Sequence, residues 1–282
     1  MRTEFFYGWY FKCQSDTRTL AVIPAVHGTG GKCTCSVQII TEEQAWTAEF
    51  PGDSFRRKGK SISIGRNRFG ERGVRLDIHV PGLEAEGELD FGLLSPPGYD
   101  IMGPFCFVPF LECRHSVWRM WHKVWGTVRI NETACIFDGA AGYWEGDRGR
   151  SFPREYIWTQ CIFPGGALML SVADIPLAGF HFRGIIGFVL LHGREYRLAT
   201  YLGAKAVRVQ NGTVRVAQGS LELEARLLER ADHPLKAPIG GTMARTIHES
   251  PACRAGYGFR ENGRTLLAFE SDRASFEYEY PG

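Results

Sequence analysis

The sequence predicts an all-β protein built as a pair of sandwich or barrel domains. Glycine is frequent, with 34 residues among 282, and aromatic residues make up 13% of the chain. This combination favours short strands and tight turns over long helices. Alternating apolar and polar segments recur, joined by short turn signals, and a long helical pattern is almost absent. Many strands with short connections are typical of sandwiches and barrels.

The clearest local signals are three hairpins in the second half of the chain. Asn211-Gly212 lies between two alternating segments, which predicts strand, type I′ turn, strand. Asn262-Gly263 and His192-Gly193 separate two further pairs of segments in the same way. In the first half, the glycines at 28, 30 and 31 follow a strand, but no Gly-Lys-Ser/Thr motif or helix follows them. They therefore predict a hairpin turn and not a phosphate-binding loop.

Period-two alternation places most of the remaining strands. In chain order they are expected over 6–12, 19–27, 33–40, 61–64, 74–80, 127–130, 135–137, 156–163, 179–183, 187–191, 194–201, 206–210, 213–216, 220–227, 259–261, 264–269 and 275–280. The Gly/Pro-rich stretch 92–104 is expected to be a long surface loop.

Segment 113–122 is ambiguous, and we expect a short helix or an irregular segment there. His115 and His122 are seven residues apart, so a helix places them on one face and a strand on opposite faces. A fresh run of strands begins after this segment. We therefore expect an N-terminal domain over 1–125 and a C-terminal domain over 126–282.

Composition excludes several classes of function. With 33 Lys+Arg against 31 Asp+Glu, the chain lacks the basic surface that nucleic acid or an anionic membrane requires. No apolar run approaches the roughly 20 residues of a membrane span, and no export signal is evident, so a cytoplasmic protein is expected.

The eight cysteines are expected to be reduced, and most of them buried. Cys33 and Cys35 have no paired Cys-x-x-Cys spacing, so no metal is expected.

The densest polar and aromatic stretch is 142–161. If it is extended, Glu145 and Asp147 share one face of a strand, and Arg148 and Arg150 share the other. In a following strand, three further side chains line one face: Tyr156, Trp158 and Gln160. A groove with aromatic walls, an amide and a carboxyl group suits a mostly apolar ligand with one polar end. The alternative is a surface turn with solvated ion pairs, beside aromatic residues of the core.

Histidines elsewhere are weaker candidates for ligand contacts. His115 and His122 are more typical of structural histidines, but they remain second-tier candidates because Cys113, Trp118 and Trp121 accompany them. His181 alternates with Phe180 and Phe182, and its face is either solvent or a polar lumen.

The run from Tyr143 to Phe163 resembles the signature of the tocopherol cyclase family. That signature has an acid shortly before Gly, then Phe-Pro, then aromatic-x-Trp-x-Gln-Cys, and Glu145, Gly149, Phe152, Pro153, Trp158, Gln160 and Cys161 match it. Segment 6–12, which contains Trp9, is similar to the family's opening strand. The sequence departs from the family in two respects. Tyr7 stands where the family usually has Glu, and plant members read Asn-Trp-Gly and Gln-Cys-Asn where this chain has Asp147-Arg148-Gly149 and Gln160-Cys161-Ile162.

The resemblance implies two lipocalin-like β-barrel or sandwich domains and closure of a ring. A phenol oxygen adds to an alkene on a prenyl tail, which needs a proton donor and aromatic walls that stabilise a tertiary cation. The roles expected are proton donation by Glu145 or Asp147, orientation of the polar head by Arg148 or Arg150, walls from Trp144, Tyr156 and Trp158, and a hydrogen bond from Gln160. Trp9, His115, His122 and His181 complete the expected binding residues. No metal, nucleotide or redox cofactor is needed.

Two functions from other classes stay open. One is a non-catalytic lipocalin-like carrier of a lipophilic molecule, which the missing acid at Tyr7 favours. The other is a carbohydrate-processing sandwich that uses Trp platforms and paired carboxylates, and only composition supports it.

Overall fold

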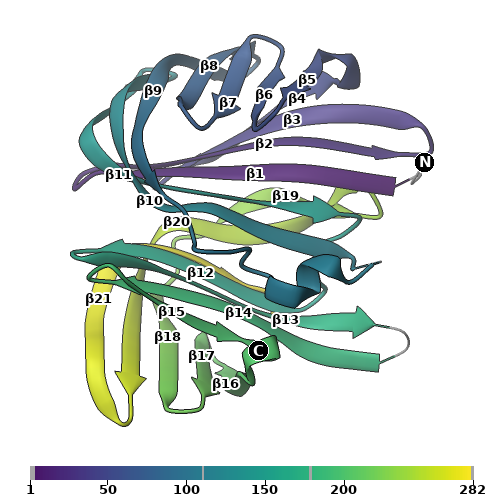
Figure 1. The fold of residues 1–282 in the computed structure, drawn as a ribbon. Helices are drawn as coiled ribbons and strands as arrows, with labels where there is room; N and C mark the ends of the chain where they lie inside the picture. The colour runs from purple at the N-terminus through teal and green to yellow at the C-terminus, as the bar shows by residue number, and fades with distance from the viewer. Residues whose placement is uncertain (1–3, 110, 178–179, 281–282) are drawn as a thin grey trace. The chain divides into compact units, whose positions relative to one another are not determined.

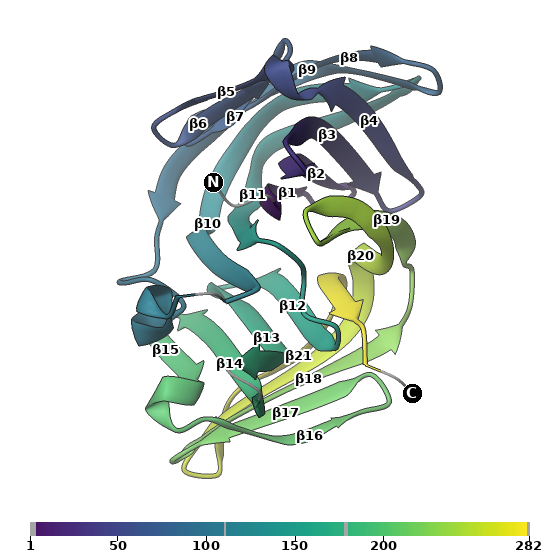
Figure 2. The same cartoon turned by 90° about the vertical axis from the view of Figure 1, so that its right-hand side faces the viewer.

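The protein is all-β, as the sequence predicts, with two large antiparallel sheets (Figures 1 and 2). The computed structural model describes residues 4–109, 111–177 and 180–280. Within these ranges the only helical segments are short 3-10 turns at Gly52–Ser54, Gly103–Phe107 and Thr200–Leu202. No helix among the described residues has the length and apolarity needed to cross a bilayer.

The first sheet contains eleven strands. In spatial order they are β4 (Ala45–Pro51), β3 (Lys32–Thr41), β2 (Thr19–Thr29), β1 (Glu4–Gln14), β11 (Thr133–Gly149), β10 (Cys113–Ile130), β9 (Leu83–Ser95), β8 (Gly73–Val80), β7 (Asn67–Gly70), β6 (Ser61–Ile64) and β5 (Phe55–Lys58). Its core draws buried side chains both from β1–β4 and from β6–β11. Phe11 of β1, for example, stacks on Trp144 of β11 at 5.2 Å and on Phe69 of β7 at 6.1 Å between ring centroids. The two halves of this sheet therefore enclose a single core.

The second sheet contains ten strands and has a separate core. In spatial order they are β15 (Arg194–Ala199), β14 (Phe180–Leu191), β13 (Gly166–Leu177), β12 (Tyr156–Phe163), β21 (Arg264–Tyr278), β20 (Thr242–Glu261), β18 (Leu221–Glu229), β17 (Thr213–Gln218) and β16 (Lys205–Gln210), with β19 (His233–Ile239) paired to β20.

The three predicted hairpin turns are confirmed. Asn211, Asn262 and His192 have φ of 52°, 52° and 48°, and the glycine after each also has positive φ. Both central residues of a type I′ turn require positive φ, which explains the Asn-Gly and His-Gly pairs. The turn expected at 28–31 joins β2 to β3, as the pairing of Thr29 with Lys32 shows.

Segment 113–122 is a strand, so the expected helix or irregular segment is wrong. Residues 113–130 form the single long strand β10, whose second half pairs with β9 from Trp121 to Ile130. Tertiary pairing overrides the helical spacing of apolar residues here, because β10 lies between β9 and β11 in the sheet. The expected loop at 92–104 is also shorter at its start, since β9 continues to Ser95.

The chain divides into two compact units, each made of three segments. Unit 1 is Met1–Pro96, His115–Phe152 and Leu235–Thr246, and unit 2 is Pro97–Arg114, Pro153–Pro234 and Ile247–Gly282. This differs from the division drawn at residue 125, which falls inside β10. The physical reason is that β10 and β11 complete the first sheet between β9 and β1.

Unit 1 also includes Leu235–Thr246, the segment around the turn between β19 and β20. The Gln38 side chain makes two hydrogen bonds to the backbone of Lys236, at 3.0 and 2.8 Å. The backbone N–H of Gly241 donates to Arg150 at 2.9 Å. Strand β19 is thereby hydrogen-bonded to β3, and the turn between β19 and β20 is bonded to Arg150, which directly follows β11.

Candidate functional site

The site begins with the alternation of side chains along β11. Trp144 points into the core of unit 1, where it stacks on Phe11. Because successive residues of a strand face opposite sides, Tyr143, Glu145 and Asp147 all lie on the other face of the sheet. The sequence predicted that Glu145 and Asp147 would share a face if this segment were extended, and the structure confirms that it is.

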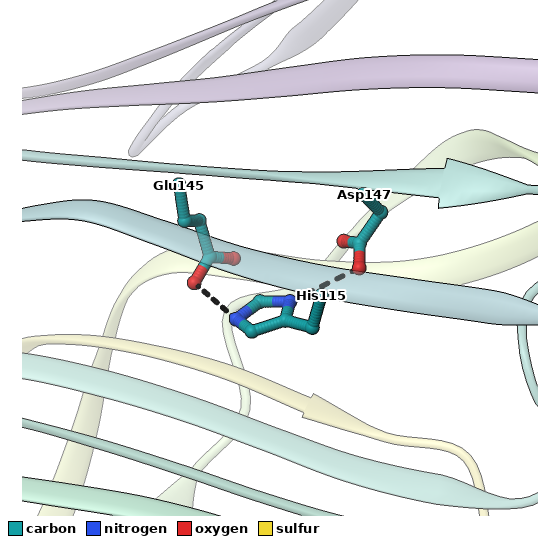
Figure 3. Close-up of side chains that lie close together, drawn as sticks. All are labelled: His115, Glu145 and Asp147. Atoms are coloured by element: carbon teal, nitrogen blue, oxygen red, sulfur yellow. Dashed lines mark hydrogen bonds and ion pairs between the residues drawn. The ribbon is translucent and has the colours of Figure 1, made fainter. Parts of the chain in front are cut away.

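His115 of β10 lies between the two carboxylates (Figure 3). Its Nδ1 is 3.0 Å from Oδ1 of Asp147, and its Nε2 is 3.1 Å from Oε2 of Glu145. The side chains are largely buried, with exposed fractions of 11% for His115, 6% for Glu145 and 18% for Asp147. We call these three residues the His115 cluster. It exists because neighbouring strands β10 and β11 bring residues about 30 positions apart to the same face.

The electrostatics of the cluster place a proton on the imidazole. Burial by itself lowers the pKa of His115, but the adjacent carboxylates of Glu145 and Asp147 outweigh it and raise that pKa well above its ordinary value. The ring is therefore an imidazolium at neutral pH, with a carboxylate at each nitrogen. A buried proton held between two bases is a common arrangement for acid–base chemistry, and it also occurs in purely structural ion-pair networks.

Tyr143 extends the cluster at its more buried end. Its hydroxyl donates a hydrogen bond to Oε2 of Glu145. Burial and the charge of Glu145 raise the pKa of Tyr143 well above its ordinary value, so the phenol stays neutral and remains a donor. On β1, Lys12 pairs directly with Tyr143 and is fully buried. Lys12 therefore lies on the face of the sheet that carries the cluster.

The donor chemistry fits a proton site better than a metal site. Among the described residues, His115, Glu145 and Asp147 are the group whose ligand atoms lie within 4.8 Å of one another, close enough to share an ion. A histidine binds a metal through an unprotonated ring nitrogen. Each nitrogen of His115 instead faces a carboxylate, so a metal would have to displace the proton between one nitrogen and its carboxylate.

Open space adjoins Asp147. In the β1–β11 register Gly8 pairs with Asp147, so a side chain at position 8 would share its face. A Cβ added at Gly8 would meet no atom within 4 Å. Asp147 is also the most exposed of the three charged side chains. The carboxylate of Asp147 is therefore the member of the cluster nearest to free volume.

Gly146 has the opposite surroundings, and this gives a matched pair of variants. A Cβ at Gly146 would lie 2.3 Å from the backbone oxygen of Gly8 and 2.8 Å from the Trp118 ring. We expect Gly146→Ala to lower the free energy of unfolding by about 2 kcal/mol, since backbone or ring must move. Gly8→Ala should change it by less than about 0.5 kcal/mol. Chemical denaturation of both variants checks this, and equal stabilities would contradict the close packing at Gly146.

Three of the predicted binding residues belong to the core of unit 1. Trp9 stacks on Phe55 at 6.1 Å, and Trp144 lies 5.0 Å from Trp118. His122 is fully buried against Phe91 at 4.3 Å between ring centroids. None of them lies on the face that carries Glu145 and Asp147. The expectation that Trp144 would form a wall beside these acids therefore fails, because it is adjacent to Glu145 in a strand.

The other predicted residues are divided between the end of β11 and unit 2. Arg148 and Arg150 are exposed. Tyr156, Trp158 and Gln160 are buried on β12 in unit 2, on the face opposite the core residues Ile157 and Cys161. The Tyr156 hydroxyl donates to Glu277. The Gln160 amide is fully buried and finds no hydrogen-bond partner for either its oxygen or its nitrogen among the described residues. His181 is exposed.

In the sequence His115 is a second-tier candidate, and the predicted site residues do not include Tyr143, Lys12 or Gly8. Tyr143 follows directly from the alternation that pairs Glu145 with Asp147, so it was available from the sequence. Lys12 and Gly8 depend on the register between β1 and β11, which joins strands more than 130 residues apart.

The fold is shared with solved structures. Kievitone hydratase from Nectria haematococca aligns over 97% of this chain and 88% of its own, at 10% identity and a TM-score of 0.57. The structure of CghA with Sch210972 aligns over 98% of this chain and 89% of its own, at 9% identity and a TM-score of 0.65. No protein-family model matches the sequence, and no curated protein matches it either. The tocopherol cyclase resemblance therefore stays a prediction, whereas the fold it implies is the one observed.

Proposed function

We propose that the protein is an enzyme that adds an oxygen nucleophile to an alkene of a lipophilic, prenylated substrate after protonating that alkene. The nucleophile is either water, which gives hydration, or a phenol oxygen of the same molecule, which gives ring closure. The observation that carries the proposal is the buried His115 ring, whose two nitrogens lie 3.1 Å from Glu145 and 3.0 Å from Asp147, with open space at Gly8 beside Asp147.

Asp147 is the residue assigned to deliver the proton. It accepts from His115 Nδ1 on one side and lies beside the free volume at Gly8 on the other. Glu145 is more buried and already accepts from Tyr143. We therefore assign Glu145, His115 and Tyr143 as positioning residues, which hold the proton and keep it directed towards Asp147. This narrows the two acids indicated by the sequence to one donor.

The proposed step balances without any redox change. The His115 proton passes from Nδ1 to Asp147, and the Asp147 carboxyl group then gives a proton to one carbon of the alkene, which leaves a tertiary cation on the other. A water or phenol oxygen forms the C–O bond and loses its proton, which returns to the cluster. Hydration adds water overall, and ring closure is an isomerisation. General acid–base catalysis of this kind contributes about 10²–10⁴-fold to rate.

Two comparisons support this assignment. One protein with the same fold is named a hydratase of kievitone, and another was solved with the small molecule Sch210972. The central motif also resembles that of the tocopherol cyclases.

Tyr7 occupies the position where that family has Glu. Its ring stacks on Trp9 at the core side of β1. An acid at position 7 would thus point away from the His115 cluster, so its absence does not favour a carrier.

The test is turnover of a panel of prenylated phenols by the purified protein, followed by mass spectrometry of extracted products. Hydration adds the mass of water, whereas ring closure changes the retention time at constant mass. Native mass spectrometry of protein purified from cells distinguishes a non-catalytic carrier from the enzyme. Recovery of an unmodified lipophilic ligand, with no product from any member of the panel, would identify a carrier and contradict the enzyme.

Filling the open space should block the reaction without touching the charged residues. We expect Gly8→Leu to reduce kcat/KM at least about tenfold, because a side chain at position 8 would occupy the volume beside Asp147. Gly8→Ala is the matched control, since its single methyl group leaves most of that volume free. Equal activity of Gly8→Leu and the parent protein would show that substrate does not enter beside Asp147.

A further inference from the structure

A pocket of about 420 Å³ lies in unit 2, and the function proposed above does not use it. His181, which the sequence indicated as a ligand-binding residue, is part of its lining. It is formed by β13, β14 and the start of β16, and its lining residues are Asp174, His181, Phe182, Arg183, Ile185, Ala204, Lys205 and Ala206. Its size falls within the range of about 300–1,000 Å³ typical of small-molecule sites. All eight residues belong to unit 2, so the pocket is distinct from the His115 cluster of unit 1.

The lining of the pocket has two kinds of surface. Ile185 and Ala204 are buried, and with Phe182 and Ala206 they provide an apolar surface. Arg183 and Lys205 are exposed and provide two positive charges. Such a combination suits a molecule with an apolar body and an acidic group.

The one carboxylate of the pocket is already engaged. Asp174 lies 3.3 Å from Nε of Arg183, and it accepts a hydrogen bond of 3.2 Å from the Tyr280 hydroxyl. The Arg183 guanidinium also lies over the Tyr280 ring, at 5.7 Å from its centroid. Arg183 and Lys205 against Asp174 leave one formal positive charge in excess.

We propose that this pocket binds a monoanionic amphiphile, namely a carboxylate on a short apolar chain. The carboxylate lies between Arg183 and Lys205, where it neutralises the excess charge, and the chain lies on Phe182, Ile185 and Ala206. Arginine is suited to this role because its planar fork presents several N–H donors to a carboxylate. The proposal concerns a second site and stands whether or not the His115 cluster is catalytic.

Calorimetric titration of the protein with octanoate, and with octanol as its neutral counterpart, tests the proposal. We expect octanoate to bind at least about fivefold more tightly than octanol, a difference that one solvent-exposed charge interaction supplies. Raising the salt concentration should narrow the difference, since the charges are exposed.

Three charge-removing variants make the test specific. Arg183→Gln and Lys205→Gln should each weaken octanoate binding about three- to fivefold and leave octanol unchanged. The control is Arg264→Gln, which removes an exposed charge at the β20–β21 turn of the same unit. Arg183→Gln also removes the ion pair with Asp174, which could change the pocket. Lys205→Gln removes a positive charge and leaves that ion pair in place. Equal affinity for octanoate and octanol, no binding of either probe at millimolar concentration, or an equal loss in Arg264→Gln would overturn the proposal.

Discussion

Asp147→Asn is expected to lower turnover of the prenylated phenols by about 10²–10⁴-fold, because an amide cannot pass a proton from His115 to the alkene. The fold should survive, since the amide keeps an oxygen that can accept from His115 Nδ1. The measurement is kcat/KM from product formation, with circular dichroism to confirm folding. The control is Arg75→Gln, which removes an exposed charge on β8 of the same unit.

The pH dependence of activity distinguishes a His115 cluster that supplies the catalytic proton from one that is only a structural ion pair. His115 carries its proton at neutral pH because Glu145 and Asp147 raise its pKa. Activity should therefore stay level through pH 7 and fall only as the pH passes that raised value. Glu145→Gln removes one of the two charges, so the alkaline fall should move to lower pH. Full activity of Asp147→Asn, or a profile that Glu145→Gln does not move, would contradict the assigned roles.

His122 is expected to govern the stability of unit 1 in acid. Burial lowers the pKa of this histidine from 6.5 to about 3. Between these pH values His122 is protonated in the unfolded chain but not in the folded chain. The free energy of unfolding therefore decreases as the pH falls from about 6.5 to 3. The slope approaches about 1.4 kcal/mol per pH unit, and the total is on the order of 4 kcal/mol.

His122→Leu should abolish this acid limb and be at least as stable as the parent at pH 7. Neither ring nitrogen of His122 has a hydrogen-bond partner in the described part of the chain, so an apolar side chain loses no bond there. Urea denaturation of both proteins from pH 4 to pH 8 measures the effect. The control is His79→Gln, an exposed histidine of the same unit, which should keep the acid limb. Identical pH dependence in parent and His122→Leu would show that His122 does not titrate as a buried group.

The contribution of His115 to stability has the opposite pH dependence to that of His122. Its folded pKa is raised, so its contribution is complete below about 6.5 and is lost as the pH rises towards the folded value. The combined contribution of these two histidines of β10 to stability is therefore largest near pH 6.5.

Local chemistry explains why much of the fold follows from the sequence. Type I′ turns need two residues of positive φ, so Asn211-Gly212 and Asn262-Gly263 identify their hairpins without tertiary information. Alternation in the 142–149 segment likewise places Glu145 and Asp147 on one face. These features depend on neighbouring residues alone, which is why they could be predicted.

The misread segment 113–122 shows where local reasoning ends. Its apolar spacing fits a helix, yet the segment is the first part of β10, between β9 and β11 in the sheet. Only that pairing makes His115 and His122 face opposite sides. The first then lies between two carboxylates and the second lies against Phe91.

By itself the sequence determined the fold class, the hairpins and the shared face of the two acids, because backbone sterics and strand periodicity act over a few residues. Tertiary structure alone decided that His115 joins those acids, that Gly8 leaves space beside Asp147, and that Trp144 is a core residue. The physical reason is that register between strands distant in the chain is set by burial of whole faces, a property of the assembled sheet.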